Sequence, residues 1–410
     1  YKIDRNYNNI MYKFFATFQN PDKPLLGPNI KILQFWGLLL PKNVFMRRFY
    51  ISIHASLAVF ILTAYIDIWC VKDDLNLLLI NLKITMLATI SLCKILTFLF
   101  WQKDWLEVIN HVTKADLAIR ATDDPKKHQL INSYTKYCRK ITIFYFVLML
   151  STVSTIITQP FYKYFSSATY RENVKNGTES YMQVVSSWVP FDKNTIPGYV
   201  AASFFQTFAT LYGGGWITAY DSNAFVVMAF IKVELEFLRI DCSEIFGTLE
   251  APVSDQVALG RLKNCHRKHV ELIKYVRILD SCLSPNMLLY MFICSVMLCV
   301  TAYQISSETS VMQQFMTAEY LIFGIAQLFI YCWHSTDVFY ASLNLSLGPY
   351  ESLWWNRNVA HWKNLYILTA QFNQIVVFTA GPFTALTMAT FISILKGAYS
   401  YYTLLRKSQM

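Results

Sequence analysis

The sequence predicts an all-α membrane protein with seven transmembrane helices, a cytoplasmic N-terminus and an extracellular C-terminus. Composition is the first observation, because 54% of the 410 residues are hydrophobic, only 15% are charged, and the mean hydropathy is +0.31. Soluble proteins carry about 25% charged residues. The second observation is that the apolar residues form long uncharged runs, and the third is that Lys and Arg gather between these runs. The net charge of +10 therefore carries information about topology and gives no reason to expect nucleic-acid binding.

The first three predicted spans lie before residue 165. Phe49 to Ile66 is an uncharged run of 18 residues and Ile141 to Tyr162 is one of 22, each long enough to cross about 30 Å of hydrocarbon as a helix. Leu75 to Phe100 is the second span, although it contains Lys83 and Lys94. Their spacing of 11 residues places both lysines on one face of a helix. Two interpretations stay open: the lysines face the helix bundle, or they take part in ligand or ion handling.

The next three spans are also predicted from long apolar runs, and one of these runs contains charged residues. Asn194 to Tyr220 and Ser281 to Ser307 are uncharged runs of 27 residues each, which predict spans four and five. Span six is expected from Phe315 to Leu347 and contains Glu319 and Asp337. Charged residues inside a span are costly, so we expect both carboxylates to have partners within the bundle.

The last apolar segment is too long for one span. Asn364 to Leu395 is uncharged over 32 residues, and the apolar character continues beyond it. Gly381-Pro382 is the expected break, because proline lacks a backbone donor and clashes with the preceding turn. The sequence therefore predicts a helix from Tyr366 to Ala380 that packs against protein, followed by span seven from Phe383 to Leu405.

The distribution of basic residues predicts the orientation of the spans. The segments that would share a side with the N-terminus contain 26 Lys and Arg, whereas those on the other side contain 7. The positive-inside rule then places the N-terminus in the cytoplasm, which is the inverse of a G-protein-coupled receptor. Asn176-Gly177-Thr178 is a glycosylation acceptor in a predicted extracellular loop, and Asn344-Leu345-Ser346 lies inside and is expected to stay unmodified.

The sequence offers no apparatus for catalysis. It contains no Walker A loop, G-x-S-x-G elbow, H-E-x-x-H or dinucleotide fingerprint, so neither an enzyme nor a cofactor is expected. Cys265, His266 and His269 lie among basic residues that oppose a metal cation, and no metal site is predicted. We expect the nine scattered cysteines to be small buried hydrophobic residues, Gly213-Gly214-Gly215 to permit a bend or close packing, and His334 to pair with Asp337.

Three segments carry a resemblance to a known family. They are Leu33 to Pro41 near the N-terminus, Tyr331-Cys332-Trp333-His334 in span six, and the final helix from Phe383-Thr384-Ala385-Leu386 to Gly397 through Leu405. Together with the predicted topology they resemble the insect odorant receptor family. The resemblance implies a ligand-gated, non-selective cation channel of four subunits with a pore lined by span seven, located in the plasma membrane of olfactory neuron dendrites. The family's coreceptor, Orco, has a longer loop than residues 230 to 284 here, so this chain resembles an odorant-tuning subunit that assembles with Orco.

The resemblance also divides the chain into functional regions. They are a cytoplasmic N-terminal region (1–48), a ligand-binding bundle of spans one to four (49–230), a cytoplasmic loop and anchor (231–284), spans five and six (285–347), a cytoplasmic loop and anchor helix (348–382), and the pore helix with an extracellular tail (383–410).

The same resemblance implies where a small volatile ligand and the gate lie. The ligand is expected in the outer half of the bundle, where Thr152 and Tyr320 could donate hydrogen bonds to its oxygen atom. Leu404 matches the hydrophobic gate, and Lys407 matches a neutral outer-pore position of Orco; four lysines there would repel cations, which favours a heterotetramer. The expected ligand contacts are Ile80, Ile84, Leu87, Met149, Thr152, Ile156, Phe204, Phe205, Phe208, Tyr320 and Phe323.

Three alternatives remain at this point. A gustatory receptor of the same superfamily would share the topology, but such receptors tend to end in T-Y-x-x-x-x-x-Q-F, which residues 399 to 405 do not spell. A metabotropic seven-helix receptor is opposed by the predicted orientation and by the absence of D-R-Y and N-P-x-x-Y motifs. A transporter would require paired repeats with broken helices in both halves, and only the Gly381-Pro382 break is evident.

Overall fold

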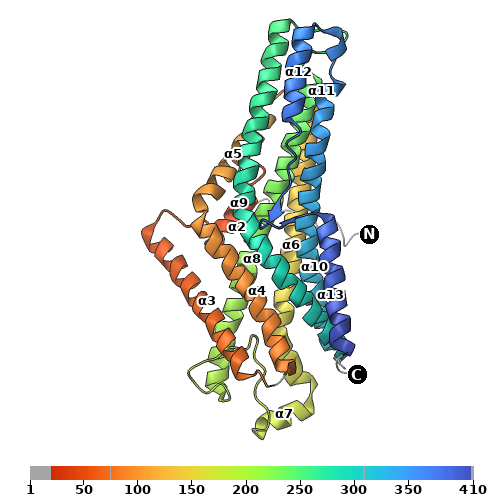
Figure 1. The fold of residues 1–410 in the computed structure, drawn as a ribbon. Helices are drawn as coiled ribbons and strands as arrows, with labels where there is room; N and C mark the ends of the chain where they lie inside the picture. Colours follow the sequence, from red (N-terminus) through yellow and green to blue (C-terminus); the bar gives the residue numbers. More distant parts are fainter. Residues whose placement is uncertain (1–19, 74, 308–309, 408–410) are drawn as a thin grey trace, which may run out of the picture.

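The computed structural model describes residues 20–73, 75–307 and 310–407 of the chain, and this part is mostly helical and contains one short hairpin (Figure 1). The elements in chain order are α2 (Gly27–Phe35), α3 (Val44–Cys70), α4 (Leu75–Phe100), α5 (Gln102–Arg120), α6 (Pro125–Ser166), α7 (Ala168–Lys175), α8 (Ile196–Ser243), α9 (Asp255–Ser307), α10 (Val311–Leu343), η1 (Asn344–Ser346), α11 (Leu347–Glu351), η2 (Trp354–Asn356), α12 (Val359–Gln371), β1 (Thr379–Ala380), β2 (Thr384–Ala385) and α13 (Met388–Lys407).

Five of the described helices are long and apolar enough to cross a membrane: α3, α4, α6, α9 and α10. They contain the predicted spans one, two, three and five, and span six as far as Leu343, where α10 ends. The predicted span four is helical from Ile196 onward, within α8, and the predicted span seven is helical from Met388 onward, within α13. The helical class of the chain is therefore confirmed, whereas the count of seven spans and their orientation stay predictions.

Several helices extend far beyond the thickness of a bilayer. At 1.5 Å per residue, the 48 residues of α8 and the 53 of α9 measure about 70 and 80 Å. In Figure 1, α12, α11 and the adjoining ends of α8 and α9 form a stalk that projects from the wider bundle containing α3 and α4. Residues 231–284 are predicted to form a cytoplasmic loop and anchor; a loop is wrong for most of them, because α8 continues to Ser243 and α9 begins at Asp255, whereas the role as an anchor stays a prediction. The charged side chains of this region are compatible with helices that stand in water.

The prediction of a helix from Tyr366 to Ala380 is also wrong beyond Gln371. There α12 ends, β1 and β2 form a hairpin in which Thr379 pairs with Ala385, and α13 begins at Met388 instead of Phe383. Gly381 has a φ of +63°, which favours glycine, and its N–H donates to the Ser284 carbonyl of α9 at 3.1 Å. Partners on α9 thus satisfy backbone groups that a helix would have paired internally.

The predicted close packing at the glycine triplet of α8 is confirmed. A Cβ on Gly214 would lie 2.8 Å from Val153 of α6, and a Cβ on Gly215 would lie 2.3 Å from the Trp36 indole. The N-terminal segment after α2 therefore rests directly on α8. Seven of the nine cysteines are buried as expected, whereas Cys70 is exposed and Cys93 half-buried.

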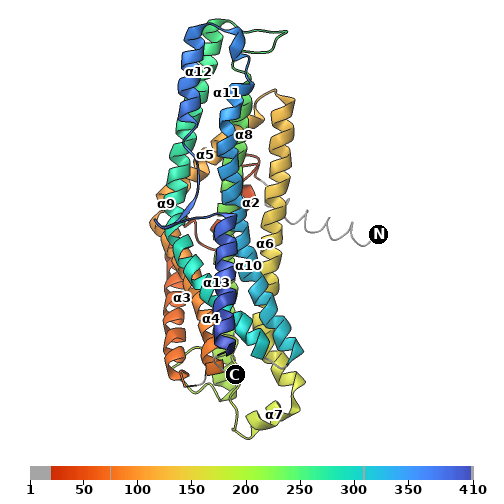
Figure 2. The same ribbon diagram turned by 45° about the vertical axis from the view of Figure 1, so that its right-hand side comes forward.

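The last helix lies beside two of the membrane helices. In Figures 1 and 2, α13 runs along α10 and ends near the C-terminus, at the end of the molecule where α7 lies. The rings of Phe329 on α10 and Phe391 on α13 are 5.6 Å apart in an edge contact. The core of the bundle is therefore connected to α13 through α9 and α10.

Candidate functional site

An apolar cavity of about 90 Å³ lies inside the bundle between α3, α4, α6, α8 and α10. This is about six times the ~15 Å³ that one water molecule needs by this kind of measure. Six of the residues predicted to contact a ligand line it: Ile84, Leu87, Met149, Thr152, Ile156 and Phe323. Helical spacing brings these residues together because positions three and four apart share a face.

The other five predicted residues do not line this cavity. The Phe204 side chain is 77% exposed, and those of Phe205 and Phe208 are more than a third exposed, so they face outward from the bundle. Tyr320 is buried, but its hydroxyl donates to the Lys83 carbonyl at 2.9 Å. Ile80 also lies outside the lining.

Sequence reasoning missed the contribution of α3 and the inward face of α8. Leu57, Phe60 and Ile61 of α3 line the cavity, together with Ala209 and Trp216 of α8. The signal that could have identified the inward face of α8 was the spacing of its small residues, since large side chains there would have filled the space.

A connection between α7 and α8 covers part of the cavity. Val185 of this connection lies in the cavity lining. The buried Gln206 side chain accepts hydrogen bonds from the Val184 and Val185 N–H groups at 3.1 and 3.4 Å, and donates to Gln183 and Ser187 at 2.9 and 3.1 Å. One glutamine of α8 thus fixes the backbone above the cavity.

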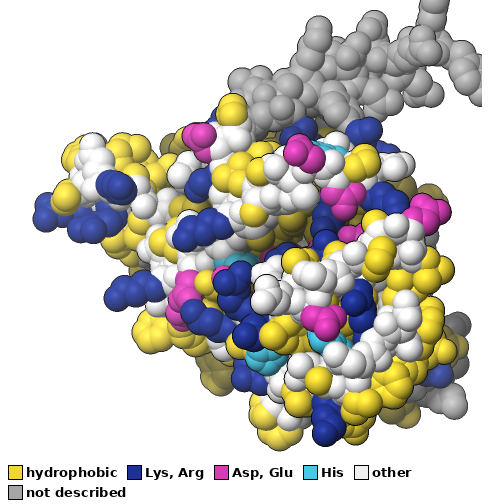
Figure 3. Space-filling model, turned by 90° about the horizontal axis from the view of Figure 1, so that it is seen from above, with side chains coloured by type: hydrophobic (Ala, Val, Ile, Leu, Met, Phe, Trp, Pro, Cys, Tyr) yellow, Lys and Arg dark blue, Asp and Glu magenta, His cyan; other side chains and the backbone are white. Residues whose placement is uncertain are grey.

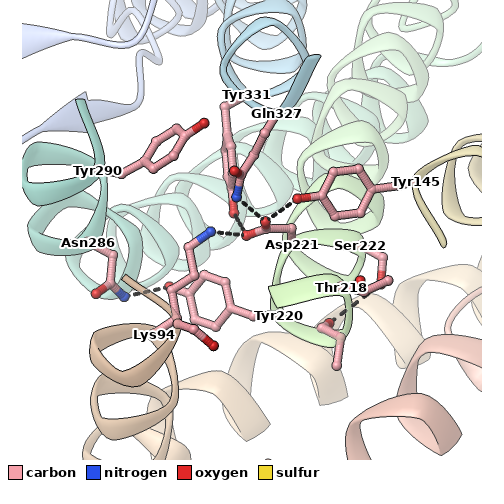
Figure 4. Close-up of polar contacts among 12 residues, drawn as sticks. Lys94, Tyr145, Thr218, Tyr220, Asp221, Ser222, Asn286, Tyr290, Gln327 and Tyr331 are labelled. Carbon is pink, nitrogen blue, oxygen red and sulfur yellow. Dashed lines mark hydrogen bonds and ion pairs between the residues drawn. The ribbon is translucent and has the colours of Figure 1, made fainter. Parts of the chain in front are cut away.

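A buried charge cluster lies one helical turn from the cavity (Figure 4). The Lys94 ammonium lies 2.6 Å from the Asp221 carboxylate, and both side chains are 1% exposed or less. The same carboxylate accepts hydrogen bonds from the Tyr145 and Tyr331 hydroxyls at 2.6 Å and from the Gln327 amide at 2.5 Å. One aspartate therefore joins α4, α6, α8 and α10.

Aromatic rings and a second polar group complete the surroundings of Lys94. Its ammonium lies 5.2 Å from the centre of the Tyr290 ring and 5.6 Å from that of Tyr220, within range of cation–π attraction. The Asn286 amide donates to the Tyr220 hydroxyl at 2.9 Å and to Thr97 at 2.6 Å, which ties α9 to the cluster (Figure 4).

Asp221 was not predicted as a site residue. Reading from charge to charge ended span four at Tyr220 because the next residue is charged, but Asp221 is completely buried within α8. The cluster and the cavity share neighbouring turns: Tyr145 lies one turn from Met149, and its ring stacks 5.8 Å from that of Phe323. The charge cluster is therefore in contact with the cavity wall.

The remaining charged residues of the spans also have partners. The Lys83 ammonium donates to the Gln304 side chain at 2.7 Å, and Glu319 accepts hydrogen bonds from Ser151 and Thr155 of α6. Asp337 lies 3.0 Å from the Lys232 ammonium of α8. The predicted pairing of His334 with Asp337 is wrong, because the imidazole instead contacts the Tyr137 hydroxyl at 3.3 Å and the Ile330 carbonyl at 2.8 Å.

The remaining predicted positions lie at the ends of helices. Leu404 is 63% exposed on α13, and the Lys407 side chain lies outside the described residues. Asn176 is exposed directly after α7. Within residues 20–73, 75–307 and 310–407, three or more His, Cys, Asp or Glu side chains nowhere gather into a possible metal site.

Long apolar helices, a buried charge cluster and an apolar cavity inside the bundle together define an all-helical membrane protein. The profile of the family described as 7tm Odorant receptor matches residues 74–399. The chain belongs to this odorant receptor family.

Relatives support this assignment along almost the full chain. Odorant receptor Or2 of Anopheles gambiae is 23% identical over 388 residues, covering 94% of this chain and 98% of that protein. Odorant receptor 30a of Drosophila melanogaster is 20% identical and covers 94% of this chain and 97% of its own length. The olfactory receptor OR5 from Machilis hrabei, solved in complex with eugenol, shares the fold with a TM-score of 0.78 at 17% identity, covering 93% of this chain and 96% of that one.

Proposed function

We propose that this odorant receptor binds a small volatile in the cavity and opens a non-selective cation channel, as one subunit of a heterotetramer with Orco. The observation that carries the proposal is the apolar cavity inside the bundle, in contact with the charge cluster that joins four helices. Burial of apolar area contributes roughly 25 cal/mol per Å², so a small volatile gains several kcal/mol there without any charged contact.

The proposed ligand contacts are those predicted residues that line the cavity. They include Ile84 and Leu87 of α4, Met149 and Ile156 of α6, and Phe323 of α10. Tyr320 and Phe204 would act on the ligand only indirectly, since neither borders the space. The site thus spans helices that a ligand could move relative to one another.

The proposed topology places the stalk in the cytoplasm and α7 outside. Figure 3 views the molecule from the stalk end, where Lys and Arg side chains spread over the surface. This agrees with the positive-inside rule. Tyr366 and Ile367 of α12 are 77% and 65% exposed, and such apolar side chains on the stalk support its role as the anchor between subunits.

The proposed pore is lined by α13. Leu404 is exposed on this helix and would form an apolar constriction that closes by dewetting. A ligand that binds the open arrangement of helices more tightly than the closed one would shift the population toward open channels. Phe323 of the cavity and Phe329 lie on the same helix, α10, and Phe329 contacts Phe391 of α13, which supports a physical route for this shift.

The test is the current through cells that express this chain with and without Orco, recorded against a panel of volatiles. The chain should give ligand-dependent cation current only with Orco. Current without Orco would indicate a self-sufficient receptor of the gustatory type, and current abolished by blocking G proteins would indicate a metabotropic receptor.

A matched pair of variants tests the cavity itself. Ala209→Phe fills the space, because Ala209 lines it, whereas Ala201→Phe adds the same side chain on the exposed face of the same helix. We expect Ala209→Phe to abolish the response at normal surface expression and Ala201→Phe to leave it within about twofold. An unchanged dose response for Ala209→Phe would remove the cavity from the mechanism.

A further inference from the structure

One hydrogen-bond donor at the cavity wall has no partner within the described part of the chain. Trp216 lines the cavity and is 1% exposed, and its indole N–H is not hydrogen-bonded. A buried donor without an acceptor loses its bonds to water and gains nothing in return. Such groups are rare in folded proteins, so this one needs a physical explanation.

The other polar side chains of the cavity wall use their hydrogens elsewhere. Ser91 donates to the Gly213 carbonyl at 3.0 Å, Thr152 donates to the Leu148 carbonyl at 3.0 Å, and Thr210 donates to the Gln206 carbonyl at 2.8 Å. The predicted role of Thr152 as a donor to a ligand is therefore not available in this arrangement. The Trp216 indole remains the donor through which the described cavity wall could recognise an acceptor.

The orientation of the indole is fixed by its aromatic neighbours. The His54 ring lies 5.1 Å away at an interplanar angle of 65°, and the Tyr212 ring lies 5.4 Å away at 89°. The Nε2–H of His54 donates to the Gly37 carbonyl at 3.1 Å, which holds this imidazole in place. His54 Nδ1 and the Tyr212 hydroxyl, on the two rings that pack against Trp216, are also without partners in the described structure.

A second tryptophan shows that a missing partner alone is not sufficient. The Trp105 indole N–H is also unpaired and buried, but its ring packs between Phe98 at 5.1 Å and Tyr220 at 5.5 Å and does not border the cavity. Only the indole of Trp216, of these two, adjoins a space that a ligand could occupy. The mostly apolar wall also offers a water molecule few of the two to four partners that buried water needs.

We propose that the Trp216 indole N–H donates a hydrogen bond to an oxygen acceptor of the ligand, and that this receptor therefore selects oxygenated volatiles such as ketones, esters, aldehydes or alcohols over hydrocarbons of the same shape. This inference rests on the proposed function and names the ligand class of the same cavity. The apolar wall supplies affinity, and the indole supplies discrimination.

The experiment compares matched ligands on the full receptor co-expressed with Orco. Each ketone or ester that activates the wild type is paired with the hydrocarbon in which carbon replaces the acceptor oxygen. Trp216→Phe keeps an aromatic ring and removes the donor. We expect it to raise the half-maximal concentration of the oxygenated ligand about 5- to 10-fold, the range of a neutral hydrogen bond, and that of the hydrocarbon less than twofold. The control Trp105→Phe should shift neither.

The outcomes separate the two proposals. A wild-type receptor that responds to no volatile would contradict the proposed function. If Trp216→Phe shifts the half-maximal concentrations of both ligands of a pair equally, or does not shift that of the oxygenated ligand, only the role of Trp216 is overturned. If Trp216→Phe does not reach the surface, benzothienylalanine at position 216 replaces the N–H by sulfur within the same ring shape. A wild type that answers hydrocarbons as strongly as their oxygenated counterparts would also overturn the inference.

Discussion

The buried pair of Lys94 and Asp221 allows a quantitative prediction. Two unit charges 2.6 Å apart attract one another by about 6 kcal/mol at an effective dielectric constant of 20. Most of this attraction offsets the loss of hydration when both groups are buried. Asp221→Asn removes one charge and leaves the Lys94 ammonium buried without a counter-ion, which costs about 3–5 kcal/mol.

The cost converts into a thermal shift. A chain of 410 residues has an unfolding entropy of about 0.9 kcal/mol per kelvin, so the variant should lose roughly 4–6 °C in thermal midpoint. Lys94→Met should lose somewhat less, because Tyr145, Tyr331 and Gln327 still donate to the carboxylate. The double variant, Asp221→Asn with Lys94→Met, buries neither charge. It should be more stable than the sum of the two single losses predicts, by a coupling free energy of about 3 kcal/mol.

The assay is the thermal midpoint of detergent-solubilised protein followed by fluorescence size-exclusion chromatography. The control is Asp337→Asn, which breaks the pair of Lys232 on α8 and Asp337 on α10. The side chains of this pair are 25% and 32% exposed. It should cost about 1 kcal/mol or less, since water screens the pair. Additive losses in the double variant, or equal losses for Asp221→Asn and Asp337→Asn, would refute the reasoning that the buried cluster holds the helices together.

Three further predictions concern the stalk, the topology and the N-terminal segment. Burial raises the pKa of the Asp241 carboxyl, but hydrogen bonds from two lysines outweigh it and lower the pKa below the ordinary 3.8, so this stabilisation is present above about pH 4 and is lost as the pH falls further. Asp241→Asn should lower the free energy of unfolding at pH 7 by on the order of 1–3 kcal/mol, which is seen as a lower thermal midpoint. It should also flatten the fall of the midpoint between about pH 4.5 and 3, and an unchanged acid profile would contradict this. Asn176→Gln should remove one glycosidase-sensitive shift in electrophoretic mobility, whereas Asn344→Gln should not. The reverse result would mean that the orientation in the membrane is opposite to the proposed one. Gly215→Ala should lower the free energy of unfolding by about 1–3 kcal/mol, because the added Cβ would clash with Trp36. The control is Gly260→Ala, whose added Cβ would have no neighbour within 4 Å and which should be neutral or stabilising. Equal effects of the two variants would refute the packing argument.

The positions of the ligand-facing residues could be predicted only in part. Helical periodicity identified the correct face of α4 and α6, where Ile84 and Met149 border the cavity. It failed on α8, because a helix that is apolar on most sides has no hydrophobic period that separates an inward face from a face toward lipid, and only the spacing of its small residues marks the inward one. Phe204 therefore had the same sequence signature as Trp216 but lies on the exposed side.

The sequence by itself determined the class of protein, the positions of most helices and the face shared by Lys83 and Lys94, because apolar length, helical period and charge spacing are local properties. Only the tertiary structure decided what those side chains meet. Lys94 finds its counter-ion 127 residues later in the chain at Asp221, whereas Lys83 finds Gln304. The extended segment before α13 likewise depends on acceptors from α9, since the Gly381 N–H donates to the Ser284 carbonyl and hydroxyl. Partners so distant in sequence are selected by how whole helices pack, and no local pattern in the chain encodes that packing.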